Sequence, residues 1–208
     1  MRDVASSTVR RLSLYLQFLD ECGRQGLATV SSGALAERGG ASPAQVRKDL
    51  SFFGSFGRRG VGYNVPLLAG RLREILGLVR RHRVILVGAG RVGTALAAYP
   101  GFRARGFDVV AVYDAEPGRI GASVDGLVVR SHETLETDLA AAPADIAVIA
   151  TPAGAAQGVA ERLVAAGVRA FLNFAPITLA VPPGVVVSDV NMALELEALT
   201  YALHHGAR

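Results

Sequence analysis

A glycine-rich turn directly after a short apolar run constrains this chain more than any other feature of its sequence. The run Val84–Val87 is typical of a buried parallel strand, and the six residues after it have the spacing G-x-G-x-x-G. In such a turn the glycines permit a tight bend, the approach of a pyrophosphate to the backbone, and close packing of a helix on a strand. The spacing therefore predicts a dinucleotide site formed by Gly88, Ala89, Gly90, Arg91, Val92 and Gly93.

An acidic residue at the end of the next predicted strand supports that site. Asp114 lies 21 residues beyond Gly93, where a carboxylate can bind the ribose hydroxyls of a nucleotide. The residues after it are Ala115 and Glu116 and not arginine, so a 2′-phosphate would be repelled. The pattern therefore favours NAD(H) over NADP(H). The alternative is that Asp114 is only a turn residue at the end of a strand.

The chain beyond residue 84 alternates short apolar runs with helical segments, which is typical of an α/β fold with a doubly wound parallel sheet. Further strands are predicted at residues 108–114, 127–129, 146–149, 170–172 and 185–187, with helices near 132–141 and 155–166. Thr151 and Pro152 follow one of these strands at the carboxyl edge, where such sheets bind ligands. We therefore expect both residues in the nucleotide site.

The positive charge of the chain is concentrated towards its N-terminus. Residues 1–83 carry 14 lysines and arginines against 6 acidic residues, whereas residues 84–208 carry 8 against 12. This asymmetry favours a part that binds a polyanion joined to a part with another task. The alternative is a basic surface that is only solvated.

Three helices are predicted in the basic part. Ser6 to Thr8 supply N-cap residues for a first helix that runs to about residue 23. The serine pair at 31–32 caps a short second helix, which the glycine pair at 39–40 ends. Ser42 then caps a third helix only a few residues later. Two helices joined by so short a turn indicate a helix-turn-helix.

The third helix has the pattern of a recognition helix. Pro43 stands at its first position, where a missing N–H costs nothing, and Val46, Leu50 and Phe53 form one apolar face. Basic and small polar residues on the opposite face suit the major groove, where arginine can bind a guanine edge with two hydrogen bonds. The residues expected to face DNA are Ala44, Arg47, Lys48 and Ser51.

A glycine-rich segment at residues 54–65 predicts a β-hairpin wing after this helix. The segment contains four glycines and the adjacent pair Arg58 and Arg59, so its tip can approach phosphate closely or enter a minor groove. An isolated arginine pair usually lies in a solvated turn, but its place after a helix-turn-helix favours DNA contact. Tyr63 of the same segment is also a predicted DNA-binding residue. A linking helix is predicted at residues 66–77.

The last predicted helix has an apolar seam. Met192, Leu196, Leu199 and Leu203 follow one another at spacings of 4, 3 and 4 residues. Such a seam can pack on a helix of a partner subunit or on the sheet of its own chain, and the spacing alone leaves both open.

Four motifs occur in order along nearly the whole chain: VRKDLS at 46–51, GRRGVGY at 57–63, YPGF at 99–102 and LNFAP at 172–176. Together with a winged helix and a dinucleotide fold they resemble the redox-sensing transcriptional repressor family Rex. The resemblance implies a homodimer that binds a palindromic operator when NADH is scarce and leaves it when NADH binds. It also implies exchange of the C-terminal helix between subunits, which favours a partner helix for the apolar seam.

The chain departs from the family pattern at two places. Arg91 and Val92 stand in the phosphate loop where the family usually has Asn and Leu, although all three glycines are kept. In the family an arginine of the first helix can pair with an aspartate at the start of the last helix, in a network with a tyrosine. Here Gln17 and Asn191 take those positions beside a retained Tyr99. An amide pair is weaker than a charged one, so coupling through these residues is expected to be weaker or to use other contacts.

Several other classes of protein and site are disfavoured. The single cysteine, Cys22, offers neither a disulfide nor a metal cluster. The four histidines form no acid–base arrangement, so we expect them at the surface and predict no catalytic or metal-binding residue. They are His82, His132, His204 and His205. The sequence shows neither a transmembrane span nor a signal-peptide pattern, so we expect a soluble cytoplasmic protein.

The sequence thus predicts three parts: a winged-helix DNA-binding domain at 1–78, a Rossmann NAD(H)-binding domain at 79–189 and a C-terminal helix at 190–208. The expected function is a repressor, not an enzyme, that senses the NADH/NAD⁺ ratio. One alternative is an NAD-dependent oxidoreductase, which would need a substrate domain that the chain has no room for. Another is a scaffold that binds CoA or a nucleotide and uses its basic domain for interactions.

Overall fold

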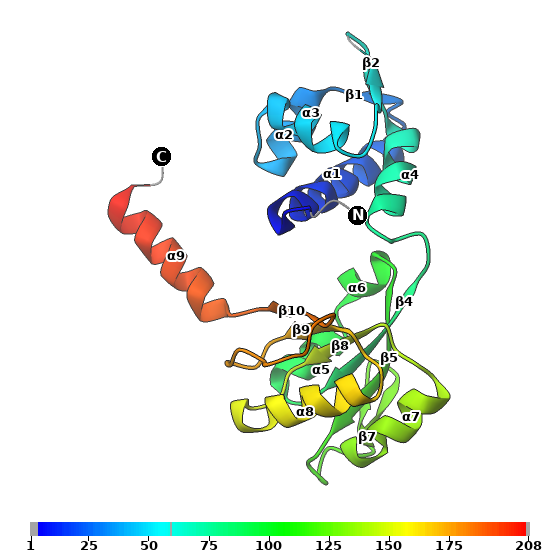
Figure 1. The fold of residues 1–208 in the computed structure, drawn as a ribbon, viewed down its shortest axis with the longest axis vertical. Helices are drawn as coiled ribbons and strands as arrows, with labels where there is room; N and C mark the ends of the chain where they lie inside the picture. Colours follow the sequence, from blue (N-terminus) through cyan, green and yellow to red (C-terminus); the bar gives the residue numbers. More distant parts are fainter. Residues whose placement is uncertain (1–3, 59, 207–208) are drawn as a thin grey trace. The chain divides into compact units, whose positions relative to one another are not determined.

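The computed structural model describes residues 4–58 and 60–206, and for Arg58 it describes the backbone alone. The chain divides into two compact units at the junction of Arg80 and Arg81. Each unit has its own hydrophobic core. Figure 1 shows the helices and strands of both units.

The N-terminal unit is a winged helix-turn-helix. Its elements in chain order are α1 (Ser6–Arg24), β1 (Thr29–Val30), α2 (Ser32–Gly39), α3 (Pro43–Ser51), β2 (Gly57–Arg58), β3 (Gly62–Asn64) and α4 (Val65–Ile75). The apolar residues of α1 that recur at helical spacing are buried against α2, α3 and α4. They are Leu12, Tyr15, Leu16 and Leu19.

Capping side chains set the starts of the short helices. Ser31 accepts a hydrogen bond from the Ala34 N–H at the start of α2, and Ser42 accepts one from Gln45 at the start of α3. The sequence predicted both caps. It was wrong for α1, where the N-cap residue is Ala5 and no side chain caps the helix.

A small three-stranded antiparallel sheet with the order β1-β3-β2 forms the wing and its base. The hairpin of β2 and β3 was predicted, but the two-residue strand β1 was not, because two residues carry no periodic signal. Gly62 has a φ of +90° and a Cβ there would lie 2.4 Å from the Val30 carbonyl oxygen, so only glycine fits between the two strands.

The C-terminal unit is a doubly wound α/β fold. Its strands are β4 (His82–Val87), β5 (Phe107–Asp114), β6 (Ser123–Val124), β7 (Leu127–Ser131), β8 (Ile146–Ile149), β9 (Ala170–Asn173) and β10 (Val186–Asp189). Its helices are α5 (Arg91–Ala97), α6 (Pro100–Ala104), the 3-10 turn η1 (His132–Thr134), α7 (Leu135–Ala141), α8 (Ala153–Ala165) and α9 (Met192–His205). The short elements α6 and β6 were not predicted.

The strands lie in the order β10-β9-β8-β4-β5-β7-β6, and all neighbours are parallel except β6 and β7. Apolar side chains of α7 and α8 pack on one face of the sheet, and those of α5 pack on the other. The chain order reverses between β4 and β8, which are neighbours. In such sheets ligands bind beyond the carboxyl ends of the strands at this switch point.

Helix α9 contributes no buried residue to the unit. The four residues of the seam are all at least 60% exposed: Met192, Leu196, Leu199 and Leu203. Two other large apolar side chains of the helix, Leu194 and Tyr201, are 57% and 67% exposed. The apolar seam therefore does not cover the sheet of its own chain, which removes one of the two arrangements that the spacing had left open.

No helix among the described residues is long and apolar enough to cross a membrane. The same part of the chain holds no group of three or more His, Cys, Asp or Glu side chains able to bind a metal ion.

Candidate DNA-binding surface and nucleotide pocket

Helix α3 presents a polar face to solvent. Ala44, Arg47, Lys48 and Ser51 are all exposed, whereas Val46 and Leu50 on the other face are buried. The Arg47 guanidinium donates to the Ser32 hydroxyl at the start of α2, 3.1 Å away. The face thus offers two cations and two small side chains, a composition suited to phosphates and base edges.

A groove of about 700 Å³ lies between this helix and the hairpin of β2 and β3. Arg47 and Ser51 line one side, and the wing glycines line the other. Tyr63 is 7% exposed and belongs to the core of the unit, so its ring forms the floor of the groove and supports the wing. Of the two predicted wing arginines, Arg59 and the side chain of Arg58 lie outside the described residues.

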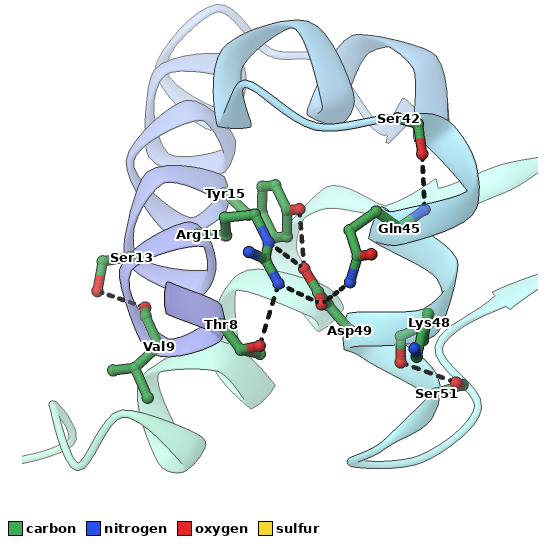
Figure 2. A network of polar contacts seen from close by, with 10 residues as sticks. All are labelled: Thr8, Val9, Arg11, Ser13, Tyr15, Ser42, Gln45, Lys48, Asp49 and Ser51. Carbon is green, nitrogen blue, oxygen red and sulfur yellow. Dashed lines mark hydrogen bonds and ion pairs between the residues drawn. The ribbon is translucent and has the colours of Figure 1, made fainter. Parts of the chain in front are cut away.

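A buried carboxylate joins α3 to α1 (Figure 2). Asp49 of α3, with a side chain 2% exposed, accepts two hydrogen bonds from Arg11 of α1 at 2.7 and 2.8 Å. Tyr15 donates to it at 3.1 Å and Gln45 at 2.7 Å. These bonds close all sides of the carboxylate, so the orientation of α3 on α1 is fixed by polar geometry as well as by apolar packing.

The network sets the ionisation of its members. Burial alone would favour the neutral acid, but the hydrogen bonds from Arg11, Gln45 and Tyr15 outweigh it and lower the pKa of Asp49. Burial, followed by the neighbouring Asp49 charge, raises the pKa of Tyr15 to about 12. At neutral pH the network therefore consists of a carboxylate, a guanidinium and a neutral phenol.

Sequence reasoning missed this network. Asp49 stands three residues after Val46 and one before Leu50, both buried, which is the signal that could have marked it as buried. Phe53, expected on the same helix face, lies beyond the end of α3 at Ser51. Its partner Arg11, 38 residues earlier, stands four residues before Tyr15 and eight before Leu19, on the apolar side of α1, whereas Arg10 is exposed. That spacing marks Arg11 as partly buried but does not identify Asp49 as its partner.

The predicted nucleotide residues come together around a cavity of about 770 Å³ at the switch point. Seven of the nine line it directly: Gly88, Gly90, Arg91, Val92, Asp114, Thr151 and Pro152. Ala89 stands behind the wall and donates its backbone N–H to Asp114 at 2.6 Å. Gly93 lies at the contact of α5 with the turn.

The glycine turn leaves no space for side chains at two of its positions. A Cβ at Gly93 would lie 1.7 Å from the Gly88 carbonyl oxygen, and one at Gly88 would lie 2.5 Å from the Ala150 carbonyl oxygen. Gly88 also has a φ of +106°. The turn therefore brings β4, α5 and the end of β8 closer together than residues with side chains allow.

Two observations test whether the cavity suits a dinucleotide. The glycine turn leaves the backbone at the start of α5 accessible, and no side chain caps the first turn of this helix. The oxygens of a phosphate could therefore accept hydrogen bonds from its N–H groups. Thr151 Oγ1 is the one buried side-chain polar atom without a hydrogen-bond partner in the described ranges 4–58 and 60–206. It lies in the cavity wall, so a polar ligand would satisfy it.

Asp114, at the end of β5, lies in the cavity wall as a carboxylate. Burial opposes its ionisation, but the Glu116 and Ala89 N–H groups and then Arg119 lower the pKa of its carboxyl. The guanidinium of Arg119, 3.2 Å from Asp114 Oδ2, also lines the cavity. Sequence reasoning considered only the two residues after Asp114 and so missed this cation, which a turn returns to the carboxylate from five residues away.

A second arginine in the cavity wall was also missed. Arg162 of α8 binds the carboxylate of Glu136 at 2.5 and 2.6 Å and the Nδ1 atom of His132 at 2.9 Å. Hydrogen bonds from Arg162 lower the pKa of Glu136 to about 2. His132 is partly exposed and lines the cavity, a place that its sequence context had not indicated.

The three predicted coupling residues lie in different units. Gln17 is on α1 of the N-terminal unit. Tyr99 precedes α6 and packs edge-on against Phe102, with ring centroids 5.3 Å apart, and Asn191 caps α9 by accepting from the Ala193 N–H. Tyr99 is 56% exposed. Their role in coupling stays a prediction.

Comparisons with known proteins agree with both sites. Residues 3–51 match the family described as "Putative DNA-binding protein N-terminus", and residues 79–177 match the "CoA binding domain" family. A solved structure described as RSP in complex with beta-NAD+ and operator DNA is 36% identical and covers 99% of this chain and 94% of its own, with a TM-score of 0.92. A structure described as RSP in complex with beta-NADH is 35% identical, and the match covers 99% of this chain and 96% of the RSP chain, with a TM-score of 0.87.

Among curated proteins, the redox-sensing transcriptional repressor Rex of Desulfitobacterium hafniense is 46% identical over 198 residues. The match covers 95% of this chain and 94% of the relative. Such identity across both units, together with the order of their elements, shows that the chain belongs to the Rex family of redox-sensing transcriptional repressors.

Proposed function

We propose that this protein represses transcription by binding operator DNA when NADH is scarce and releases the DNA when NADH binds. The observation that carries the proposal is the presence in one chain of an exposed basic recognition helix and a glycine-turn cavity at a sheet switch point. Relatives of this chain have been solved with NAD⁺ and operator DNA together and with NADH. A dinucleotide and DNA are the ligands that the cavity and the exposed face of α3 suit, so these relatives support the proposal.

The residues of the cavity have separate roles in holding the nucleotide. The start of α5 and Arg91 would hold the pyrophosphate, Asp114 the adenosine ribose, and Thr151 a polar group near the end of β8. The nicotinamide ring supplies the signal, because reduction removes its positive charge. Phe174 and Met192 also line the cavity, so the wall includes the first residue of α9.

The unit of function in this proposal is a homodimer. Helix α9 exposes an apolar seam that a partner helix would cover, which agrees with exchange of this helix between subunits. Two subunits can present their α3 helices to successive major grooves about 34 to 36 Å apart. NADH would favour an arrangement that loses this spacing, with Gln17, Tyr99 and Asn191 coupling the units.

The alternatives considered from the sequence give way to this proposal. The family consists of transcriptional repressors, not enzymes, so we set aside an oxidoreductase. A CoA-binding scaffold would explain the match of residues 79–177 but not the identity that extends through the winged helix. Since the proposed partner is operator DNA, we place the protein in the cytoplasm.

The test of this function is a DNA-binding titration in which the NADH:NAD⁺ ratio varies while total nucleotide stays constant. Operator affinity should fall as the ratio rises. Coupling of binding free energies is reciprocal, so operator DNA should weaken NADH binding by the same factor, about 5- to 150-fold for typical couplings. Equal operator affinity at every ratio would refute the proposal.

Replacing Arg47 by alanine should separate the two sites. The exposed guanidinium is expected to contact DNA, so operator affinity should fall by about 10-fold or more, with NADH affinity within about twofold of the original. Fluorescence polarisation of labelled operator and nucleotide fluorescence measure the two affinities. A matched loss of both would show that Arg47 acts through folding and not through DNA contact.

A further inference from the structure

The adenosine side of the cavity contains a charged arrangement that the proposed function does not use. NADH and NADPH have the same nicotinamide ring and differ only in the phosphate on the 2′ oxygen of the adenosine ribose. A sensor that responds to one and not the other must discriminate at that oxygen. In dinucleotide folds of this type, an acidic residue at the end of the second strand faces this ribose. Asp114, at the end of β5, has that position.

The Asp114 carboxylate is already largely occupied. It accepts hydrogen bonds from the N–H groups of Ala89 at 2.6 Å and Glu116 at 2.8 Å, and from the Arg119 guanidinium at 3.2 Å. A carboxylate offers about four acceptor positions, so these donors leave room for roughly one ribose hydroxyl. The side chain is 7% exposed, so its charge is poorly screened by water.

Arg119 is held in place from two sides. Its backbone N–H donates to the Glu116 carbonyl at 2.9 Å, and its carbonyl accepts from the Ala122 N–H, so the turn after β5 fixes where its side chain begins. Its guanidinium binds Asp114 with one nitrogen and the Glu116 carboxylate, 2.9 Å away, with another. The same guanidinium lies 3.8 Å from where a Cβ on Gly90 would stand, at the edge of the glycine turn.

In NADP-binding folds an arginine near the adenosine ribose holds the 2′-phosphate. Here two carboxylates share it, and the three side chains together carry one net negative charge. A 2′-phosphate would add about −1.5 to −2 charges beside that group, at a site where the cation is already paired. A ribose with free hydroxyls adds none.

From this geometry, and resting on the proposed function, we infer that Glu116 makes the sensor selective for NADH over NADPH by pairing with Arg119, which would otherwise bind the 2′-phosphate. The sequence alone had suggested that selectivity comes from the absence of an arginine after Asp114. In this inference an arginine is present, and selectivity comes from the carboxylates that keep it from the 2′-phosphate. Glu116 and Arg119 are specificity-determining residues for the nucleotide.

The test compares NADH and NADPH binding to the full-length protein and to Glu116→Gln. Glutamine keeps the size of the side chain but removes its charge, so the Arg119 nitrogen that pairs with Glu116 becomes available to the phosphate while the other stays on Asp114. The ratio of the NADPH to the NADH dissociation constant should fall by about 10-fold, since a charge-assisted bond to phosphate is gained while NADH binding changes by less than about twofold. Both nucleotides are followed by the same nicotinamide fluorescence.

Glu74→Gln is the matched control. Glu74 has a side chain 56% exposed against 58% for Glu116, and it pairs with Arg71 three residues away, as Glu116 pairs with Arg119. It lies on α4 in the other unit, so its ratio should equal that of the unchanged protein.

The double variant Glu116→Gln with Arg119→Ala makes the inference decisive. If Glu116 acts through Arg119, Glu116→Gln should lower the ratio in the unchanged protein but not in Arg119→Ala, which is a non-additive result in a double-mutant cycle. A gain that persists without Arg119, or a ratio for Glu116→Gln within about twofold of the control, would overturn the inference. An NADH affinity close to that of the unchanged protein shows in each variant that the C-terminal unit is folded.

The selectivity of nucleotide binding and the proposed repressor function can fail independently of each other. The ratio is measured on nucleotide binding alone, whereas the proposed function depends on the response of operator binding to NADH. A protein whose operator affinity ignores NADH would refute the function and still give a selectivity ratio. Absence of NADH binding by the unchanged protein would refute both.

Discussion

Asp49→Ala should lower the free energy of unfolding of the N-terminal unit by about 3 kcal/mol and operator affinity by about 100-fold. The variant removes one partner of a buried ion pair and leaves Arg11, which is 21% exposed, without its carboxylate. Tyr15 and Gln45 lose an acceptor in the same step. Because Asp49 joins α3 to α1, the loss should reach the DNA face although Asp49 itself is buried.

The pH dependence of this effect follows from the lowered pKa of Asp49. A carboxyl whose pKa is lower in the folded than in the unfolded state contributes its full stability above the unfolded value, about 4, and loses it as the pH falls through the folded value. The difference between the two proteins should therefore be constant at neutral pH and shrink only in acid. Urea unfolding at several pH values measures it.

Two variants control this prediction. Asp49→Asn keeps the shape and one acceptor oxygen, so it should restore part of the stability and of the operator affinity. Glu74→Ala removes an exposed carboxylate that also pairs with arginine and should change stability by less than about 0.5 kcal/mol. If Asp49→Ala binds operator DNA as tightly as the original, the network has no part in orienting α3.

Gly93→Ala should abolish the NADH response while operator binding persists. The added Cβ would lie 1.7 Å from the Gly88 carbonyl oxygen and 3.0 Å from Leu86 Cδ2, so α5 must move away from β4. A displacement of about 1 Å is enough to cost about 100-fold where groups must be positioned, and here it moves the whole phosphate-binding turn. Since the winged helix has its own core, the variant should repress at every NADH concentration.

NADH titration by fluorescence and operator binding with and without NADH measure both parts of this result. Gly154→Ala is the control, because a Cβ at that position in α8 meets no atom within 4 Å, and alanine favours a helix by about 1 kcal/mol. It should bind NADH normally with equal or greater stability. Normal NADH binding by Gly93→Ala would mean that the turn does not hold the nucleotide.

Elements with strong local signals could be predicted from the sequence. The continuous apolar strands β4, β5 and β8, the serine caps of α2 and α3 and the glycine turn all depend on neighbouring residues. Their type and order, together with the acid at Asp114, were sufficient to identify most of the residues that line the cavity proposed for the nucleotide. The DNA face of α3 followed from the same helical periodicity.

The features that could not be predicted depend on contacts between distant residues or on the path of a turn. Arg11 meets Asp49 only because α1 and α3 cross in the folded unit, 38 residues apart in sequence. Arg119 returns to Asp114 only because the turn after β5 reverses direction. His132 and Tyr63 have ordinary local contexts, and only the packing around them places one in a cavity wall and the other under the wing.

The exposed apolar seam of α9 has a consequence for how the number of chains in the cell affects repression. In the proposed homodimer a second copy covers the large apolar side chains that α9 exposes to water, so a single chain gains free energy by pairing. Below the concentration at which such pairs form, the amount of DNA-competent repressor rises with the square of the number of chains in the cell. The regulator then responds to its own abundance as well as to nucleotide, and a modest change in its synthesis shifts promoter occupancy more than proportionally.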